Sequence, residues 1–272
     1  MEYKELVPGV RIPVLGQGTS GIGRSPSGSR DKAEIDALRA GIDLEMTHID
    51  TAERYSAGRS EELVGEVIEP YRREDLFITT KVGQNHLRYD DVVASMRGSL
   101  DRLDLDYVDL YLVHWPNPNV PLEETMRAME HCADEGYTRF IGVSNFSASL
   151  LAEAQSYLGE HRLVADQVHY SLLSQEPAGE LLPYCRENDV TLIAYSPLEK
   201  GRLTKPGYSV LDELADKYGK TQAQISLNWL IFQEGVVAIP KASRLEHVND
   251  NAEAVGWELS DEDVKRLAES FH

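Results

Sequence analysis

The chain has 272 residues, of which 42% are hydrophobic, so it is long enough to form one large α/β domain. Acidic residues outnumber basic ones by 46 to 27, which gives a formal net charge of -19 at pH 7. This charge would repel nucleic acid and an anionic membrane surface, and we expect neither as a partner. No segment approaches the roughly 20 apolar residues needed to cross a bilayer, so we expect a cytoplasmic protein.

The cysteines and the basic residues indicate which metal sites and which surroundings to expect. Cys132 and Cys185 lie far apart, without the Cys-x-x-Cys or histidine spacing that binds zinc, so we expect two buried thiols and no metal. The 27 basic residues comprise 18 Arg and 9 Lys. An arginine-biased acidic surface is typical of proteins that work in concentrated salt, but an ordinary acidic enzyme can also carry it. Both interpretations stay open, because net charge reports on solubility and not on chemistry.

Short β-branched or aromatic runs alternate with amphipathic stretches along the chain, and this alternation predicts β/α units around a parallel sheet. The predicted strands are Val14 to Thr19, Thr47 to Thr51, Leu76 to Val82, Tyr107 to His114, Phe140 to Ser144, Val164 to His169, Thr191 to Ser196 and Val236 to Pro240. The predicted helices are Asp31 to Leu44, Ser60 to Ile68, Asp91 to Leu103, Leu122 to Glu135, Ser147 to Tyr157, Gly179 to Asn188, Thr221 to Phe232 and Arg244 to Ala254.

Two segments lie outside this repeated pattern. Leu6 to Pro13 contains a Pro-Gly turn and predicts an N-terminal hairpin, and Ser260 to Ser270 predicts an extra C-terminal helix. We therefore predict one (β/α)8 TIM barrel domain over residues 1–272.

Local signals refine some boundaries. Ser60, Ser147 and Thr221 stand where three of the helices should begin, as capping residues do. The glycines of Gly21 to Gly23 lack the Gly-x-Gly-x-x-Gly spacing of a Rossmann site, so Gly21 to Ser29 is predicted to be a mobile βα loop.

Polar residues at the strand ends are the candidates for chemistry, because barrel active sites lie at the C-terminal ends of the strands. Asp50, Lys81 and His114 end three successive predicted strands, and Tyr55 lies in the loop after Asp50. Each of these residues alone has an ordinary structural explanation. Together they predict a shared site, because an apolar strand rarely ends in a charge that has no partner.

Ordered motifs along nearly the whole chain resemble the aldo-keto reductase superfamily. They are Gly16-Gln17-Gly18-Thr19, His48-Ile49-Asp50-Thr51-Ala52 with Tyr55, Thr80-Lys81, Asp109-Leu110-Tyr111-Leu112-Val113-His114-Trp115-Pro116, Gly142-Val143-Ser144-Asn145-Phe146, Ala194-Tyr195-Ser196-Pro197-Leu198 and Ile239-Pro240-Lys241. Within the superfamily the chain is most similar to short prokaryotic members that act on methylglyoxal, diketones and other small carbonyls.

The resemblance implies an oxidoreductase in which Tyr55 protonates the carbonyl oxygen as hydride arrives. It also implies that Lys81 lowers the pKa of this phenol, that Asp50 holds Lys81, and that His114 orients the carbonyl. Substrate contacts are expected from Ser20, Tyr55, His114 and Trp115. Many relatives have Trp at the position of Ser20, and longer members cover the substrate with a C-terminal tail where this sequence stops at His272. Both departures favour small carbonyls.

The implied cofactor is NADPH. The residues expected to bind it are Gly18, Thr19, Asp50, Ser144, Asn145, Gln167, Tyr195, Ser196, Pro197, Leu198, Lys200, Gly201, Arg202, Ile239, Lys241, Ser243, Arg244, His247, Asp250 and Asn251. Ser144, Asn145 and Gln167 would surround the carboxamide, with the Tyr195 ring on the face of the nicotinamide. The cations after the seventh and eighth strands favour NADPH, whereas His247 replaces a frequent Arg and leaves NADH open as a weaker alternative.

Three functions remain to be separated. The first is reduction of small aldehydes, ketones or dicarbonyls, and the second is oxidation of a sugar or alcohol by the same site. The third is a non-catalytic, cofactor-sensing subunit, which the intact set of four residues disfavours. We expect a monomer.

Overall fold

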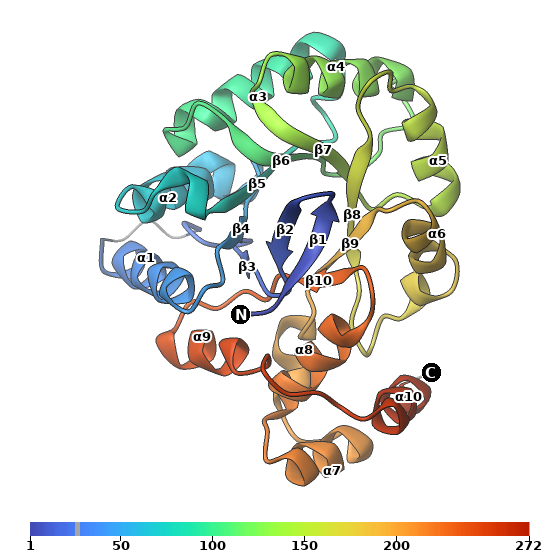
Figure 1. Cartoon of the computed structure of the whole chain (residues 1–272). Helices are drawn as coiled ribbons and strands as arrows, with labels where there is room; N and C mark the ends of the chain where they lie inside the picture. Colours follow the sequence, from blue (N-terminus) through green and yellow to red (C-terminus); the bar gives the residue numbers. More distant parts are fainter. Residues whose placement is uncertain (25–27, 272) are drawn as a thin grey trace.

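A computed structural model describes residues 1–24 and 28–271 of the chain. Eight parallel strands form one curled sheet, ordered as they occur in the sequence (Figure 1). They are β3 (Gln17–Gly18), β4 (His48–Asp50), β5 (Phe77–Val82), β6 (Val108–Val113), β7 (Thr138–Ser144), β8 (Leu163–His169), β9 (Thr191–Tyr195) and β10 (Val236–Ala238). Strands β5 and β6 are buried along their whole length, as expected for parallel strands covered on both faces.

Backbone hydrogen bonds also link the two ends of this sheet. The Gly16 N–H donates to the Ala238 carbonyl at 2.8 Å, and the Gly18 N–H donates to the Pro240 carbonyl at 3.1 Å. Gly18 permits this approach, because a Cβ there would lie 2.9 Å from the Ile239 carbonyl oxygen. The arrangement is consistent with the predicted TIM-like barrel. The first predicted strand is much shorter than expected, since only Gln17–Gly18 forms a regular ladder.

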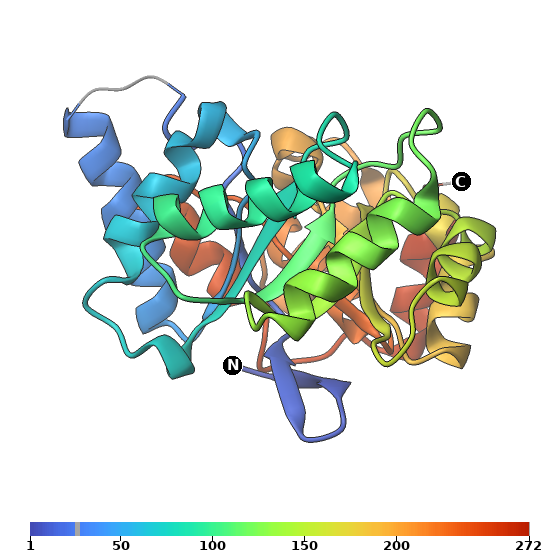
Figure 2. The same ribbon diagram turned by 90° about the horizontal axis from the view of Figure 1, so that it is seen from above.

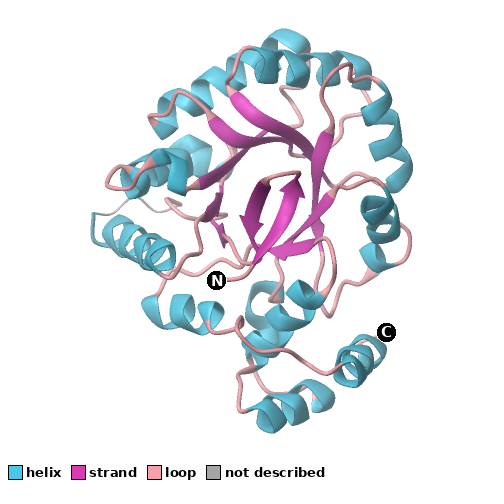
Figure 3. Ribbon diagram, viewed as in Figure 1, coloured by secondary structure: helices cyan, strands magenta, loops and turns pink. Residues whose placement is uncertain are grey.

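Helices surround the sheet on its outer side (Figure 3). They are α1 (Gly28–Asp43), α2 (Arg59–Ile68), α3 (Tyr89–Leu103), α4 (Leu122–Asp134), α5 (Ala148–Ser156), α6 (Leu181–Glu187), α7 (Ser209–Tyr218), α8 (Gln222–Phe232), α9 (Leu245–Ala252) and α10 (Asp261–Ser270). Short 3-10 segments occur at η1 (Tyr55–Gly58), η2 (Arg73–Asp75), η3 (Glu176–Ala178) and η4 (Glu199–Thr204).

Helix α7 is absent from the sequence-based prediction. It lies at the periphery beside the C-terminal helix α10, which was predicted (Figure 1). Lys217 Nζ and the Tyr218 hydroxyl of α7 both donate to Asp263 of α10, at 2.7 and 2.6 Å. Two segments that are distant in sequence therefore stabilise each other outside the helix ring.

The predicted N-terminal hairpin is confirmed. It consists of β1 (Tyr3–Val7) and β2 (Val10–Pro13), which pair antiparallel, so its first strand starts at Tyr3 rather than at Leu6. The hairpin covers one end of the sheet (Figure 2). Leu6 and Ile12 are buried there in a core shared with inward side chains of the strands, such as Ile193. The active-site candidates therefore have only the other end of the sheet available.

The expected helix starts are correct in two of three cases. The Ser147 hydroxyl accepts a hydrogen bond from the Leu150 N–H at 3.2 Å, and Thr221 forms a capping box at the start of α8. Ser60 is not a cap, because α2 begins after Gly58 and the Ser60 hydroxyl donates to Thr19 Oγ1 at 2.9 Å.

Two other sequence-based expectations concern the first loop and the thiols. Residues 25–27 of the loop predicted over Gly21 to Ser29 lie outside the described residues, and Gly28 already begins α1. Helix α1 therefore includes the last two residues of the predicted loop, Gly28 and Ser29. Cys132 and Cys185 are free and buried, as expected, and burial raises the pKa of each thiol to about 12.

Candidate active site

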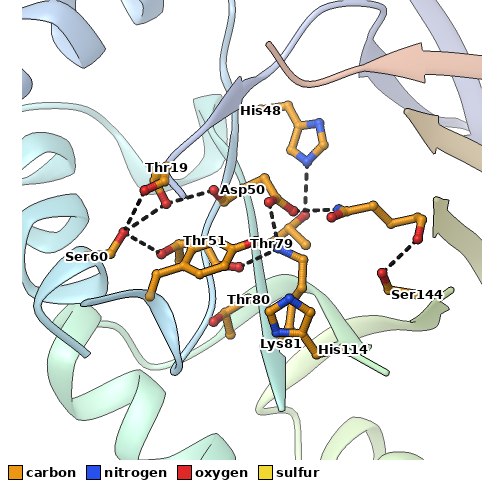
Figure 4. Close-up of polar contacts among 12 residues, drawn as sticks. Thr19, His48, Asp50, Thr51, Ser60, Thr79, Thr80, Lys81, His114 and Ser144 are labelled. Carbon is orange, nitrogen blue, oxygen red and sulfur yellow. Dashed lines mark hydrogen bonds and ion pairs between the residues drawn. The ribbon is translucent and has the colours of Figure 1, made fainter. Parts of the chain in front are cut away.

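The predicted strand-end residues meet at one end of the sheet (Figure 4). Asp50 is the last residue of β4, Lys81 is the next to last of β5, and His114 directly follows β6. Tyr55 begins the η1 segment after β4. Neighbouring parallel strands bring these ends together although the residues are far apart in sequence.

Lys81 occupies the centre of the cluster and is fully buried. Its Nζ donates to Asp50 Oδ1 at 2.6 Å, to the Thr51 carbonyl at 2.8 Å and to the Tyr55 hydroxyl at 3.4 Å. An ammonium has three donors, so all of them have acceptors. The buried charge is thus neutralised and satisfied, which a low-dielectric site requires.

The Asp50 carboxylate is held from two sides. Its Oδ2 accepts a hydrogen bond of 2.7 Å from Gln167 Nε2 on β8, while Oδ1 faces Lys81. Gln167 was expected at the nicotinamide carboxamide, and its link to Asp50 was not predicted. The two residues are 117 positions apart, so no local pattern could show the contact.

Tyr55 is presented by a strained turn. Ser56 and Ala57 have φ values of 52° and 55°, and Gly58 follows at 91°. Left-handed conformations are costly for residues with a Cβ and often occur at functional sites. The Ser56 hydroxyl donates to the Ile22 carbonyl at 2.6 Å and anchors the turn. The Tyr55 ring meets the His114 ring edge to face, with centroids 5.5 Å apart.

The electrostatics correct one expectation. Burial raises the pKa of Tyr55, and the nearby Lys81 ammonium lowers it by less, so the net shift is upward rather than downward. The negative charge of Asp50 also raises the pKa of Tyr55 and partly cancels the effect of Lys81. Tyr55 is therefore fully protonated at neutral pH in this structure.

At neutral pH Lys81 is charged and His114 is neutral. Burial lowers the pKa of Lys81, but the Asp50 carboxylate and the Tyr55 phenol outweigh burial and raise it. Burial, Lys81 and Arg54 lower the pKa of His114 to about 3, so its imidazole is neutral at neutral pH. Its buried Nδ1 has no hydrogen-bond partner among the described residues, and His114 also lines the cavity described below.

A second polar network lies beside this cluster. Asn145 Nδ2 donates to Ser144 Oγ at 2.9 Å and to the His114 carbonyl at 3.1 Å, and the Tyr195 hydroxyl donates to Asn145 Oδ1 at 2.9 Å. The His169 ring stacks parallel to the Tyr195 ring at 5.5 Å and contacts Glu199. The side chains expected around a nicotinamide are therefore already held in place.

A cavity of about 1010 Å³ opens next to both networks and extends to α9. Sites for small molecules and cofactors typically occupy about 300–1,000 Å³. The expected site residues that line it are Gly18, Ser20, Asp50, Tyr55, His114, Trp115, Ser144, Asn145, Gln167, Tyr195, Ser196, Pro197, Leu198, Lys200, Gly201, Ile239, Lys241, Ser243, Arg244, His247, Asp250 and Asn251. Lys81 lies behind Tyr55 and Asp50 without lining the cavity.

Two expected cofactor residues do not reach this cavity. Thr19 is fully buried, and its hydroxyl donates to the Asp50 carbonyl at 2.9 Å. Arg202 is exposed and directs its guanidinium toward the Tyr208 hydroxyl at 3.5 Å. Conversely, Arg24, Arg30 and Lys205 line the cavity and were not predicted. Arg24 lies in the loop after the first strand, a position that could have identified it.

Comparison with known proteins identifies the family. Residues 14–271 match the Aldo/keto reductase family. The methylglyoxal reductase YeaE of Escherichia coli is 37% identical over 265 residues, which cover 96% of this chain and 92% of that protein. The crystal structure of a thermostable aldo-keto reductase, Tm1743, is 48% identical with a TM-score of 0.94 and covers 99% of this chain and 100% of the other. An aldo-keto reductase from Klebsiella pneumoniae in complex with NADPH is 37% identical, with a TM-score of 0.88 and coverages of 96% and 92%.

These matches and the site geometry agree on the class of protein. The chain belongs to the aldo/keto reductase family, as the sequence motifs indicated, and the prediction of an oxidoreductase of this class is confirmed.

Proposed function

We propose that this protein reduces small aldehydes, ketones or dicarbonyls such as methylglyoxal, with NADPH as hydride donor and Tyr55 as proton donor. One observation carries the proposal. Tyr55 lines a large cavity, and its hydroxyl oxygen accepts a hydrogen bond from a buried ammonium that is neutralised by Asp50. The names of relatives such as the Escherichia coli methylglyoxal reductase support a small carbonyl substrate.

The proton transfer follows from the hydrogen bonds of Tyr55. Because Lys81 donates to the phenol oxygen, the hydroxyl hydrogen of Tyr55 is free to point at a substrate oxygen. As the carbonyl oxygen gains negative charge, this proton moves to it and leaves a phenolate 3.4 Å from the ammonium. Neutral His114 can donate a second hydrogen bond that orients the carbonyl.

The cavity suits a dinucleotide phosphate. Asn145, Gln167 and Tyr195 offer amides and a flat ring near Tyr55, and Lys241 and Arg244 offer cations toward α9. Burial lowers the pKa of Lys241 despite Glu34, and the nearby Arg30 and Arg24 lower it further, so an anionic ligand would relieve repulsion among cations. When bound, NADPH would supply the hydride. NADH is the weaker alternative, because fewer of these cations would have a phosphate to bind.

The remaining parts of the proposal concern the whole chain. We propose that residues 1–272 form one closed (β/α)8 domain that acts as a monomer in the cytoplasm. None of the described helices has the length and apolar character needed to span a bilayer. Two alternatives predict other outcomes. A dehydrogenase of sugars or alcohols would show net oxidation of its substrate, and a cofactor-sensing subunit would bind the cofactor without turnover.

The test follows NADPH absorbance with methylglyoxal in the wild type and in Tyr55→Phe. We expect the substitution to lower kcat by at least about 100-fold while NADPH still quenches or shifts protein fluorescence, because only the proton donor is removed. Tyr184→Phe is the matched control, since Tyr184 is half-buried on α6 and does not line the cavity. An unchanged rate in Tyr55→Phe would show that the assignment of the acid is wrong.

A further inference from the structure

A second cavity is lined by Tyr55 and by the turn that follows it. Its volume is about 530 Å³, and Ser20, Gly21, Arg24 and Tyr55 line both this cavity and the larger one. A substrate whose carbonyl oxygen lies at Tyr55 could therefore extend into this smaller space. We call it the Tyr55 side pocket.

Three arginines line the Tyr55 side pocket, and only one is neutralised. Arg59 forms ion pairs with Asp31, Glu62 and Glu66. Arg24 and Arg54 are exposed and form no ion pair with any described residue. This contrast is unexpected in a protein with 46 acidic residues, where a guanidinium readily finds a carboxylate.

The neighbouring acid does not supply the missing charge. Glu53 precedes Arg54, but Glu53 Oε1 accepts hydrogen bonds from the Gly83 N–H at 2.6 Å and from His86 Nδ1 at 2.9 Å. The positive charge of Arg54 also acts on the neighbouring His114 ring, whose pKa is lowered by burial, by Lys81 and by Arg54. Arg54 is thus within electrostatic range of the proposed reaction centre.

The strained turn gives Arg54 a defined position. Arg54 directly precedes Tyr55, and the left-handed residues Ser56 and Ala57 follow. The hydrogen bond from Ser56 to the Ile22 carbonyl, at 2.6 Å, ties this turn to the segment that carries Arg24. The segments that carry the two unpaired arginines are therefore tied together, and both arginines line the same pocket as Tyr55.

We propose that the substrate carries a carboxylate in addition to its carbonyl group, and that Arg54 and Arg24 bind this carboxylate in the Tyr55 side pocket. The planar fork of a guanidinium matches the two oxygens of a carboxylate. The substrate class is thus a short oxo acid, such as an aldehyde with a terminal carboxylate. This inference rests on the proposed reductase function and adds a specificity subsite to it.

The experiment compares two aldehydes of the same shape. Succinic semialdehyde carries a carboxylate where 4-methylpentanal carries two methyl groups, so the ratio of their kcat/KM values isolates the charge. We expect the wild type to favour succinic semialdehyde, and Arg54→Gln and Arg24→Gln each to lower the ratio by about tenfold, mainly through the KM of the acid. Arg127→Gln is the control, because it removes the same charge from an exposed residue of α4 that lines neither cavity.

The possible failures are distinguishable. A ratio that stays unchanged in both variants would overturn the carboxylate subsite, as would a wild type that reduces methylglyoxal but not succinic semialdehyde. If Arg24→Gln changed only the KM of NADPH, Arg24 would belong to the cofactor site and the two-arginine subsite would be wrong. If the wild type reduced no carbonyl at all, the proposed function would fail together with this inference.

Discussion

His48 and Gly16 show that a motif residue can serve packing rather than chemistry. His48 is fully buried, its Nε2 lies 3.0 Å from Thr79 Oγ1, and its ring packs edge to face on Phe77 with centroids 5.3 Å apart. A Cβ at Gly16 would lie 2.8 Å from His48 Nδ1, so glycine is required beside this ring. Both residues belong to the motifs that resemble the family, yet neither lines the cavity.

The buried ring of His48 predicts a loss of stability in mild acid. Burial and Lys81 lower the pKa of His48 from 6.5 to about 3. Between these pH values His48 is protonated in the unfolded chain but not in the folded protein. The contribution of neutral His48 to the free energy of unfolding is therefore complete above pH 6.5 and is lost as pH falls toward 3. At pH 5 the free energy of unfolding is lower by about 2 kcal/mol on account of His48.

The measurement compares urea unfolding at pH 7 and pH 5. We expect His48→Gln to be less stable than the wild type at pH 7 but to lose about 2 kcal/mol less on acidification. His131→Gln is a control on the outer helix α4. An equal loss in the wild type and in His48→Gln would contradict a neutral buried His48.

At the scale of elements, one lysine joins the N-terminal hairpin to the last β/α unit. Lys4 Nζ of β1 donates to the carbonyls of Ile231, Gln233 and Val236, at 2.7, 2.5 and 2.6 Å. Two of these carbonyls lie at the C-terminal end of α8, where unpaired carbonyls favour a cation. The hairpin thus does more than cover the core, because it also caps a helix and holds the start of β10.

Removal of this contact should destabilise the whole fold. We expect Lys4→Met to lower the free energy of unfolding by about 2 kcal/mol, because three carbonyls lose a charged donor in a partly buried place. Chemical denaturation at pH 7 measures the change. The matched control is Lys32→Met on α1, where the lysine is exposed. Similar small effects of both substitutions would show that the Lys4 bonds contribute little.

At the scale of the molecule, the net charge of -19 is unevenly distributed. Arginines pair with acids on the outer surface, as Arg266 does with Glu213 and Arg72 with Glu74. Cations concentrate instead around the larger cavity, where Lys200, Lys241 and Arg244 are found. The protein can therefore attract an anionic cofactor locally while its surface as a whole repels polyanions.

The excess of acidic groups predicts that salt stabilises the protein. Added KCl screens repulsion among the carboxylates, since the Debye length falls from about 10 Å at 0.1 M to about 3 Å at 1 M. We expect the Tm and the reductase activity to rise between these concentrations. Thermal unfolding followed by circular dichroism checks the first part. A flat response across molar KCl would favour an ordinary acidic enzyme over one adapted to concentrated salt.

Local pattern was sufficient for the order of the strands and for three of the four central residues. A parallel sheet is buried on both faces, so its strands stand out as apolar runs, and charges at their ends are conspicuous. Asp50, Lys81 and His114 could be placed in this way, and so could the helix starts at Ser147 and Thr221. The family resemblance added the cofactor residues, of which Thr19 and Arg202 do not line the cavity.

Contacts between segments that are remote in sequence were visible only in the tertiary structure. The link from Gln167 to Asp50, the packing of α7 on α10 and the unpaired arginines beside Tyr55 all join parts of the chain that share no local pattern. The direction of the Tyr55 pKa shift belongs to the same group, because it is a balance between burial and two opposite charges. Sequence shows which groups are present, whereas burial and Coulomb interactions depend on the dielectric and the separation that the folded chain imposes.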